Sequence, residues 1–376
     1  MFEHSTVFGI DSHARTTTVC AIVAETGEVR CREFRGNPYA EIAAWMLSFP
    51  QPSLGVYESG CTGFHPKRAL ESLGCRVEVA ATSGLPLPPE ARSKKSDRRD
   101  AERLARAALA GGLRFVWCPD EETEGLRDLS GALEDLRDRA RRDQQRVLAF
   151  LLRRGVVWDE RTPGGRPRRM WGERFWEWLR SMSFEGPAQV AWEALLDACE
   201  ASRRACASAE AAARGAVAAG GAAGRVDALQ ALGGVGFLLA LAFAAEVGDF
   251  GRFRSGRAVT SYFGLAPSER SSGARVRLGG MSRAGSALVR RLLVEGAWCY
   301  ARCDAGSRKR PPRGVPASVA AEARRGSRRL RSRRVALEAR SLPRCKANGA
   351  TAAELARWCW AVGLASQRAG RPAPRP

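Results

Sequence analysis

The chain has 376 residues and a hydrophobic share of 45%, which is enough for two or three domains with buried cores. Its 61 basic and 40 acidic residues give a net charge of +21, which favours a polyanionic partner. It has no window of about 18 uncharged apolar residues and no N-terminal signal-peptide pattern, so we expect a cytoplasmic, nucleoid-associated protein without a membrane partner.

The first 118 residues predict a mixed α/β domain. Alternating apolar residues predict three strands joined as an antiparallel meander, at 6–11, 16–23 and 29–34. Helices are then expected at 38–48, 64–73 and 97–109, alternating with strands at 54–57 and 76–80. Three antiparallel strands followed by alternating helices and strands are the order of a ribonuclease H-like fold.

Four carboxylates occupy regular places in this order. Asp11 and Glu58 end strand-like apolar runs, and Asp97 and Asp100 are three residues apart in a helical pattern, so their Cβ atoms lie about 5–6 Å apart. Mg²⁺ or Mn²⁺ prefers oxygen ligands, and two ions about 3.5–4 Å apart activate the attacking oxygen and stabilise the leaving one. Any one of the four alone is more often a cap or a surface residue. Together they predict a two-metal phosphoryl-transfer site.

Residues 119–220 predict a helical hairpin or coiled coil. A charged, proline-free helix over 120–154 would span roughly 50 Å, and its leucine stripe must pair with another helix or subunit. Further helices are expected at 171–182 and 187–214. The Ala/Gly run 215–224 has the composition of a linker.

Residues 226–300 predict a second compact domain. The segment 229–236, with Gly233, Gly234 and Gly236, resembles a helix-hairpin-helix. Its glycines are explained equally well by close approach of a phosphate to the backbone or by a tight helix–helix turn.

Residues 301–376 hold 19 basic and 4 acidic residues. Of these, 307–334 has 11 Lys or Arg residues and predicts a nucleic-acid-binding arm or a mobile segment, followed by a closing helix at 354–364. The chain uses 56 arginines and 5 lysines, and arginine binds phosphate with a bidentate fork. Codon bias in a GC-rich genome accounts for that ratio but not for the clustering.

The eleven cysteines are scattered and form no CxxC pair, and the chain has three histidines. This pattern argues against a zinc site and against a disulfide framework, so we expect ordinary reduced thiols.

Several motifs carry a family resemblance. Gly9-Ile10-Asp11, the run Tyr57–Phe64, Lys95–Ala101 (KSDRRDA) and Trp117-Cys118-Pro119 resemble the N-terminal half of the insertion sequence 110 family of transposases. The later motifs Phe253–Ser255, Tyr262–Ser268, Ser271–Gly273, Arg283–Gly285 and Leu288–Arg291 resemble that family's C-terminal domain. The resemblance covers about residues 6–300 and returns weakly at 350–364.

The resemblance implies a RuvC-like DEDD domain, a coiled coil and a small, mainly helical transposase domain that carries a catalytic serine. It implies a DNA recombinase, guided in characterised relatives by a structured bridge RNA that pairs with donor and target DNA. By motif, the four carboxylates would be the metal ligands, and Ser272 would form a phosphoserine link to DNA. Ser271 leaves the choice of nucleophile open, and Ser96 and the run Met281–Arg283 depart from the usual motif residues.

The expected nucleic-acid contacts are arginines beside these motifs: Arg98, Arg99, Arg270, Arg275, Arg277, Arg283, Arg290 and Arg291. Because a long helical segment separates Asp100 from Ser272, we expect a homodimer or homotetramer in which one subunit's carboxylates meet another subunit's serine.

Three other functions compete with this interpretation. A metal-dependent nuclease or Holliday-junction resolvase would use water and need no serine. An actin-like ATPase shares the Gly-Ile-Asp start and the Thr16–Thr18 run, but its Asp-x-Gly-Gly motif is absent. A catalytically inactive nucleic-acid-binding relative would have no reason to keep all four carboxylates.

Overall fold

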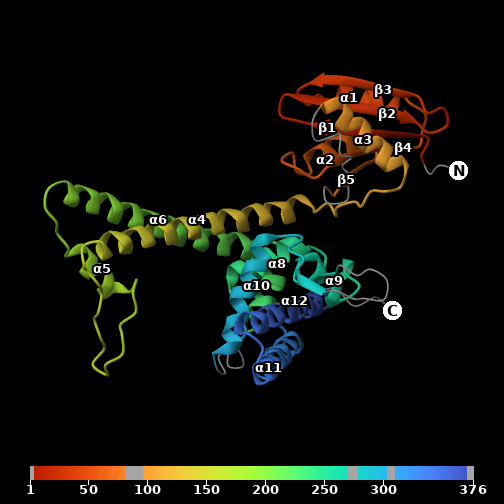
Figure 1. Cartoon of the computed structure of the whole chain (residues 1–376). Coiled ribbons are helices and arrows are strands. Elements are labelled where there is room, and N and C mark those ends of the chain that lie inside the picture. Colours follow the sequence, from red (N-terminus) through yellow and green to blue (C-terminus); the bar gives the residue numbers. More distant parts are fainter. Residues whose placement is uncertain (1–3, 82–95, 270–277, 303–309, 371–376) are drawn as a thin grey trace. The chain divides into compact units, whose positions relative to one another are not determined.

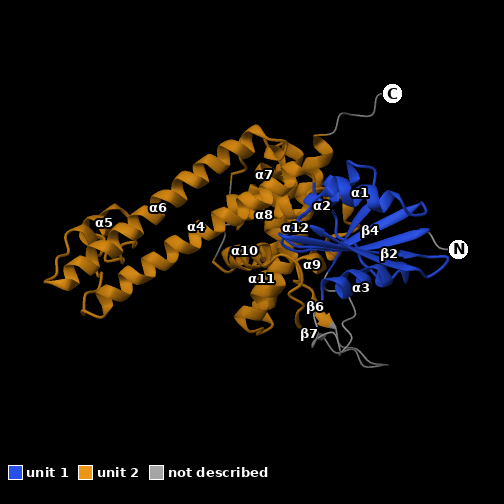
Figure 2. Cartoon of the chain, turned by 90° about the horizontal axis from the view of Figure 1, so that it is seen from above, with its two compact units in different colours: residues 1–119 blue, residues 120–376 orange. Residues whose placement is uncertain are grey.

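The computed structural model describes residues 4–81, 96–269, 278–302 and 310–370. These residues form two compact units, unit 1 (residues 1–119) and unit 2 (residues 120–376), which Figure 2 colours separately. Apart from Pro119, the three predicted segments 119–220, 226–300 and 301–376 all belong to unit 2.

Unit 1 is built on a five-stranded sheet of order β3-β2-β1-β4-β5. The strands are β1 (Thr6–Ser12), β2 (Thr16–Val23), β3 (Val29–Arg35), β4 (Ser53–Glu58) and β5 (Val77–Ala80). The first three form the predicted antiparallel meander, while β4 pairs in parallel with both β1 and β5. Parallel pairing requires crossovers, which contain α1 (Tyr39–Leu47) and α2 (His65–Glu71). The predicted mixed α/β class is therefore confirmed.

Helices cover both faces of this sheet. Phe8 of β1 packs against Trp45 and Phe49, with ring centroids 6.0 and 5.4 Å apart, in the core that α1 and α2 share with the sheet. On the other face, Val56 of β4 packs with Leu104 of α3 (Asp97–Leu109). Since side chains alternate along a strand, the residues of β1 and β4 that face α3 form a separate set from those that face α1.

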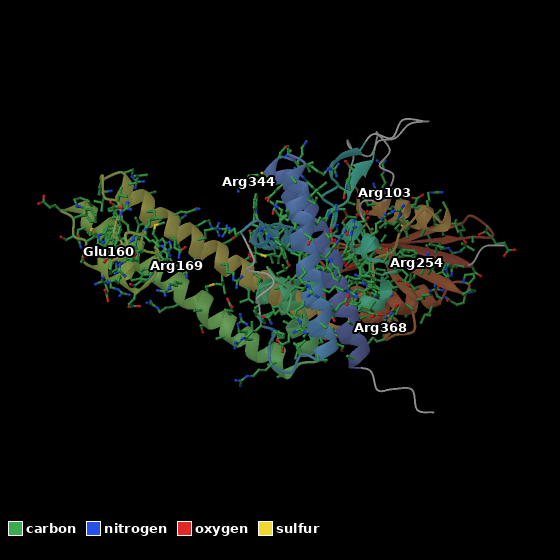
Figure 3. The ribbon with its side chains drawn as sticks, turned by 90° about the horizontal axis from the view of Figure 1, so that it is seen from below. Arg103, Glu160, Arg169, Arg254, Arg344 and Arg368 are labelled. Atoms are coloured by element: carbon green, nitrogen blue, oxygen red, sulfur yellow. A yellow bond between two sulfur atoms is a disulfide. The ribbon has the colours of Figure 1, made fainter. Side chains whose placement is uncertain are left out.

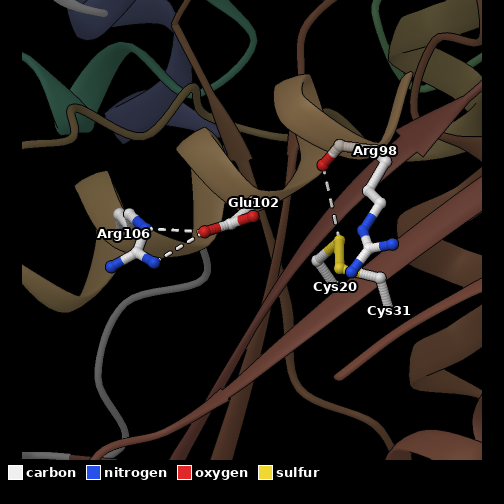
Figure 4. The surroundings of a disulfide bond; sticks show 5 residues. All are labelled: Cys20, Cys31, Arg98, Glu102 and Arg106. Carbon is white, nitrogen blue, oxygen red and sulfur yellow. Dashed lines mark hydrogen bonds and ion pairs between the residues drawn. A yellow bond between two sulfur atoms is a disulfide. The ribbon is translucent and has the colours of Figure 1, made fainter. Parts of the chain in front are cut away.

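A disulfide joins Cys20 of β2 to Cys31 of β3, so the prediction that all cysteines are reduced thiols is wrong for this pair. The antiparallel register places the two residues opposite each other with their Cα atoms 4.1 Å apart. Cys20 Sγ also lies 3.5 Å from the carbonyl oxygen of Arg98 in the first turn of α3 (Figure 4). Sequence spacing could not reveal the pair, because only the hairpin register brings the thiols together.

Unit 2 begins with a pair of long helices. These are α4 (Glu121–Leu152) and α6 (Pro187–Ala219), which lie side by side in Figure 1 and are joined through the short α5 (Glu173–Arg180). The Asp120 carboxylate caps α4 by accepting the Thr123 N–H at 2.7 Å. At the α5 end of the pair, an aromatic core contains Phe150, Phe175, Trp176 and Trp192. Of the predicted apolar stripe, Leu133, Val147 and Leu151 are buried. Its other members are half-buried: Leu126, Leu129, Leu136, Ala140 and Leu148.

The predicted linker at 215–224 is wrong over its first half. α6 continues to Ala219, and only three residues separate it from α7 (Ala223–Gln230). Ala213, Val217 and Ala222 are buried in a core that also contains Leu133 of α4. Alanine has the highest helix propensity, and its small side chain allows close helix packing, so composition alone misidentified a packed helix end.

The remainder of unit 2 is a helical bundle. It contains α7, α8 (Phe237–Val247), η3 (Phe250–Arg252), α9 (Gly256–Tyr262), β6 (Pro267–Glu269), β7 (Leu278–Met281), α10 (Ala287–Ala297), η4 (Trp298–Ala301), α11 (Ala317–Ala339) and α12 (Arg344–Ala369). α8 carries apolar residues on all its sides, and every residue of it except Glu246 is buried. Among the helices of the described ranges, none is long and apolar enough to cross a membrane.

The glycines between α7 and α8 contact the protein itself. Gly234 has φ +76°, and a Cβ there would lie 2.2 Å from the carbonyl oxygen of Gly296 in α10. The Gly233 carbonyl accepts a hydrogen bond from the Tyr300 hydroxyl at 2.7 Å, and its N–H donates to Ser327 Oγ at 3.1 Å. Of the two open interpretations, these contacts support the tight helix–helix turn.

Residues 317–334 of the Arg-rich segment belong to a packed helix, so the prediction of a mobile segment is wrong for them. Their predicted binding of nucleic acid stays a prediction. One face of α11 contributes Val319, Ala323 and Leu330 to the bundle core. Arg334 is fully buried, and its guanidinium donates to Glu338 at 2.7 Å and to Asn348 Oδ1 at 3.1 Å. An arginine count alone misses this arrangement because the apolar residues repeat at helical spacing between the charges.

Candidate active site

The ends of β1 and β4 bring the first two carboxylates together. The two strands pair in parallel with Ile10 opposite Tyr57, so Asp11 and Glu58 follow as neighbours at the same edge of the sheet. Both side chains lie on the α3 face, because Asp11 is two residues from Gly9 and Glu58 is two residues from Val56.

Gly9 lets α3 approach this edge. A Cβ at Gly9 would lie 1.8 Å from the Ala101 carbonyl oxygen and 2.7 Å from the Ala105 nitrogen, so only glycine permits the observed packing. The first turn of α3, which carries Asp97 and Asp100, therefore lies over the end of β1. The sequence motif and the close helix–sheet contact together gather all four predicted carboxylates.

Asp11, His13 and Asp97 form one half of the cluster. One ligand atom from each lies within 4.8 Å of the other two, and His13 Nε2 is 3.3 Å from Asp11 Oδ1. Burial raises the pKa of Asp11 above its ordinary value, repulsion from Asp97 and Asp100 adds to this shift, and His13 opposes it. Such an environment disfavours an uncompensated negative charge.

Asp11 Oδ2 is the feature that tests whether a metal fits. This oxygen is buried and has no hydrogen-bond partner among the residues that the structure describes. A buried carboxylate oxygen without a partner is costly, and a bound cation would satisfy it. Carboxylate oxygens are the ligands that Mg²⁺ and Mn²⁺ prefer, and the imidazole nitrogen of His13 is a further ligand for a transition-metal ion, so the residues present fit a divalent ion.

Glu58 and Asp100 form the other half of the cluster and share a cation from the protein. Arg103 Nη2 lies 3.2 Å from Glu58 Oε1 and 3.3 Å from Asp100 Oδ1. Asp11 and His13 of the first half line a hollow of about 380 Å³ together with Glu58, Asp100 and Arg103. The arrangement supplies the negative charge, the oxygen ligands and the space that a metal-assisted phosphoryl transfer requires.

Comparison with known proteins identifies the family. A family model for a DEDD transposase of the IS110 group matches residues 8–154, and one described as "Transposase IS116/IS110/IS902 family" matches residues 226–311. "Putative transposase y4qE" of Sinorhizobium fredii is 38% identical over 317 residues, covering 81% of this chain and 74% of the relative. The chain belongs to the IS110 family of transposases.

Other IS110-type relatives are more distant. "Transposase for insertion sequence element IS1111A" of Coxiella burnetii is 27% identical over 246 residues, or 60% of each chain. "Transposase for insertion sequence element IS1533" of Leptospira borgpetersenii is 26% identical over 180 residues, or 47% of this chain and 50% of the relative. The DEDD match implies a ribonuclease H-like fold for unit 1 and the use of a divalent metal.

The serine region of this IS110-family chain is described at its flanks. Ser271, Ser272, Arg270, Arg275 and Arg277 lie outside the described residues. The strands on either side, β6 and β7, pair antiparallel with Pro267 opposite Met281. They follow α9 and precede α10, so the serine segment connects two strands anchored in the helical bundle.

The other predicted nucleic-acid contacts have different surroundings. Arg98 and Arg99 are exposed on α3, and Arg283 is exposed after β7 with φ 59°. Arg290 instead donates to the carbonyl oxygens of Phe263 and Ala284 at 3.2 and 2.8 Å. Arg291 forms ion pairs with Glu134 of α4 and Glu295 of α10.

Sequence reasoning missed two residues that the structure places in the carboxylate cluster, His13 and Arg103. His13 is two residues beyond Asp11, so a strand continued to this point would have placed both on one face. Arg103 is three residues beyond Asp100, the spacing at which helical side chains meet. Neither spacing alone predicts a site residue. Only the fold brings His13 to Asp11 and Arg103 to Glu58.

Unit 2 contains an Arg-lined groove between α11 and α12, called here the α11–α12 groove. Its hollow is about 500 Å³, and its five arginines are Arg257, Arg325, Arg329, Arg333 and Arg357. Glu354 lies beneath Arg329 and Arg333, at 3.2 and 2.6 Å. The Arg325 and Arg329 side chains are 67% and 61% exposed, whereas the Glu354 side chain is 13% exposed, so the groove presents positive charge.

The basic surface extends along α12. Arg344 and Arg368 lie near its two ends (Figure 3). A second hollow of about 640 Å³ shares Arg333 and Arg357 with the groove and reaches Gly279 and Gly280 of β7. A phosphate backbone in the α11–α12 groove would therefore continue toward the β6–β7 strands.

Proposed function

We propose that the protein cleaves and rejoins DNA strands with Mg²⁺ or Mn²⁺, held by Asp11, Glu58, Asp97 and Asp100, and with Ser272 as the nucleophile. The observation that carries the metal-dependent part is the buried Asp11 Oδ2, which lacks a protein partner among the described residues. A bound divalent ion would polarise the scissile phosphate and lower the pKa of the attacking hydroxyl.

The covalent step follows from this set of residues. Ser272 Oγ forms a bond to the DNA phosphorus, the bond from phosphorus to the leaving sugar oxygen breaks, and the serine proton ends on the leaving hydroxyl. The phosphodiester is conserved as a phosphoserine link, so attack by a DNA hydroxyl reverses the step and joins a new strand. Arg270, Arg275 and Arg277 flank the serine in the sequence and would neutralise the phosphate.

The α11–α12 groove supports a nucleic-acid partner. Exposed guanidiniums above shielded carboxylates provide paired donors for phosphate oxygens. By analogy with characterised members of the IS110 family, the proposal includes a bridge RNA that selects donor and target DNA. A non-coding stretch beside the gene that encodes a structured RNA would support this guidance.

The experiment that tests the serine step is capture of a covalent complex. The wild-type protein, incubated with labelled DNA and Mg²⁺, should yield a protein–DNA adduct that survives denaturation, and Ser272→Ala should not. Ser271→Ala is the matched control, because it removes the adjacent hydroxyl. If Ser272→Ala still cleaves DNA and no adduct forms with either protein, the water-using nuclease replaces the serine recombinase.

The proposal places the carboxylates and the serine of one active site on different subunits of a homodimer or homotetramer. Asp11→Ala and Ser272→Ala chains should each be inactive alone and regain partial activity when mixed. Failure of the mixture, with stable mixed oligomers present, would assign both groups to one subunit.

A further inference from the structure

The two halves of the carboxylate cluster differ in what neutralises them. Asp11 pairs with His13, which offers a ligand nitrogen, whereas Glu58 and Asp100 share the guanidinium of Arg103. Arg103 therefore lies where a cation would bridge a β4 carboxylate and an α3 carboxylate.

We propose that Arg103 is a tethered cation that holds the Glu58–Asp100 half in the protein free of nucleic acid. The chain then binds one divalent ion readily through Asp11, His13 and Asp97, and binds a second only when Arg103 leaves. The inference rests on the proposed metal-dependent function. Its physical basis is that a guanidinium and a metal ion cannot occupy the same carboxylate oxygens, because both are positive.

The surroundings of Arg103 make it displaceable. One of its terminal nitrogens makes both carboxylate contacts, and its Nε is buried without a hydrogen-bond partner among the described residues. The guanidinium is therefore only partly satisfied. A DNA phosphate offers two oxygens to the same fork, so substrate provides an alternative partner for Arg103. Entry of the second ion would then be coupled to the arrival of DNA.

A second arginine on α3, Arg106, does not pair with the carboxylate cluster and therefore provides a comparison for Arg103. Arg106, three residues further along α3, pairs with Glu102 at 2.6 Å within the helix and is 62% exposed (Figure 4). Arg103 is 22% exposed and links α3 to β4. A substitution at Arg106 thus removes the same charge from the same helix without touching the cluster.

The test is a titration of the full chain with Mn²⁺ in the absence of nucleic acid. Electron paramagnetic resonance or calorimetry measures how many ions bind and how tightly. The wild type should bind one ion well and a second weakly. Arg103→Met should tighten the second ion about tenfold, because that ion no longer displaces charge-assisted hydrogen bonds. Arg106→Met should match the wild type, and Arg103→Lys, which keeps the charge, should keep the second ion weak. Adding a short DNA duplex to the wild type should tighten its second ion.

Two results would overturn the inference in distinguishable ways. If the wild type already binds two ions equally well, or if folded Arg103→Met and Arg103→Gln both titrate like Arg106→Met, Arg103 is not a tethered cation and the proposed function stands. If neither the wild type nor any variant binds Mn²⁺, and if Asp11→Asn leaves DNA cleavage unchanged, the metal-dependent function fails and the inference fails with it. Thermal melting of each variant shows that the titrated protein is folded.

Discussion

The two units of the chain use charged residues in opposite ways. Unit 1 gathers carboxylates at one sheet edge, where Asp11 and Asp100 are about four-fifths buried and each is fixed by a strand end or a helix turn. Unit 2 instead carries exposed arginines on α11, such as Arg325 and Arg329, whose side chains are 67% and 61% exposed. Chemistry on a phosphate requires ligands placed to within a fraction of an ångström, whereas binding a phosphate backbone requires only positive charge within reach. Substitutions in the two units should therefore separate cleavage from binding.

The largest effect is expected from Asp11→Asn. Loss of this ligand should reduce DNA cleavage by about 10³-fold or more, because the metal is lost or misplaced. DNA affinity, which depends on arginines elsewhere, should remain unchanged. A cleavage assay and a binding titration on the same samples measure both. Glu28→Gln, an equal charge change at a turn of unit 1, is the control, and normal cleavage by Asp11→Asn would exclude the proposed site.

Gly9→Ala tests whether the close approach of α3 positions the carboxylates. The added methyl group would meet the Ala101 carbonyl, so α3 must move. Unfolding free energy should fall by about 1–3 kcal/mol, and cleavage should fall with it. Gly125→Ala is the matched control, since Gly125 faces open space on α4 and alanine there should stabilise the helix by about 0.5–1 kcal/mol. If Gly9→Ala and Gly125→Ala changed the unfolding free energy and cleavage equally, Gly9 would not be what positions the carboxylates.

The α11–α12 groove is tested by Arg325→Gln combined with Arg329→Gln. DNA binding should weaken, and the slope of log affinity against log salt should fall by about 0.9 for each lost phosphate contact. Arg146→Gln with Arg204→Gln removes two similarly exposed arginines from α4 and α6 and should leave the slope unchanged. Identical slopes for the two double variants would mean that the groove does not bind the backbone.

The smallest effect on cleavage is expected from removal of the Cys20–Cys31 disulfide. Cys31→Ser should lower the unfolding free energy of unit 1 by about 2–3 kcal/mol, because an 11-residue separation is no longer closed in the unfolded chain. Cleavage should persist, since the strands are also paired by their backbone. Calorimetry with and without reductant measures the change, and a shift in the unfolding of unit 2 would contradict its assignment to unit 1.

By itself, the sequence determined the order of elements in unit 1 and predicted that four carboxylates share one site. Short apolar runs that end in Asp11 and Glu58 predict strands, and Asp97 and Asp100 at helical spacing predict a shared face, because these signals are local. The family motifs are also local, because each is a short run of consecutive residues. The same local signals located α4 and α6 as long helices.

Tertiary structure decided everything that depends on partners distant in the sequence. The register of β2 and β3 joined Cys20 to Cys31, and the contact of α3 with Gly9 set the carboxylates over the sheet edge. Arg334, which the sequence places in an Arg-rich arm, is buried in the core of the helical bundle. A side chain's role depends on which groups the fold brings within a few ångströms, and composition and spacing carry no record of those distances.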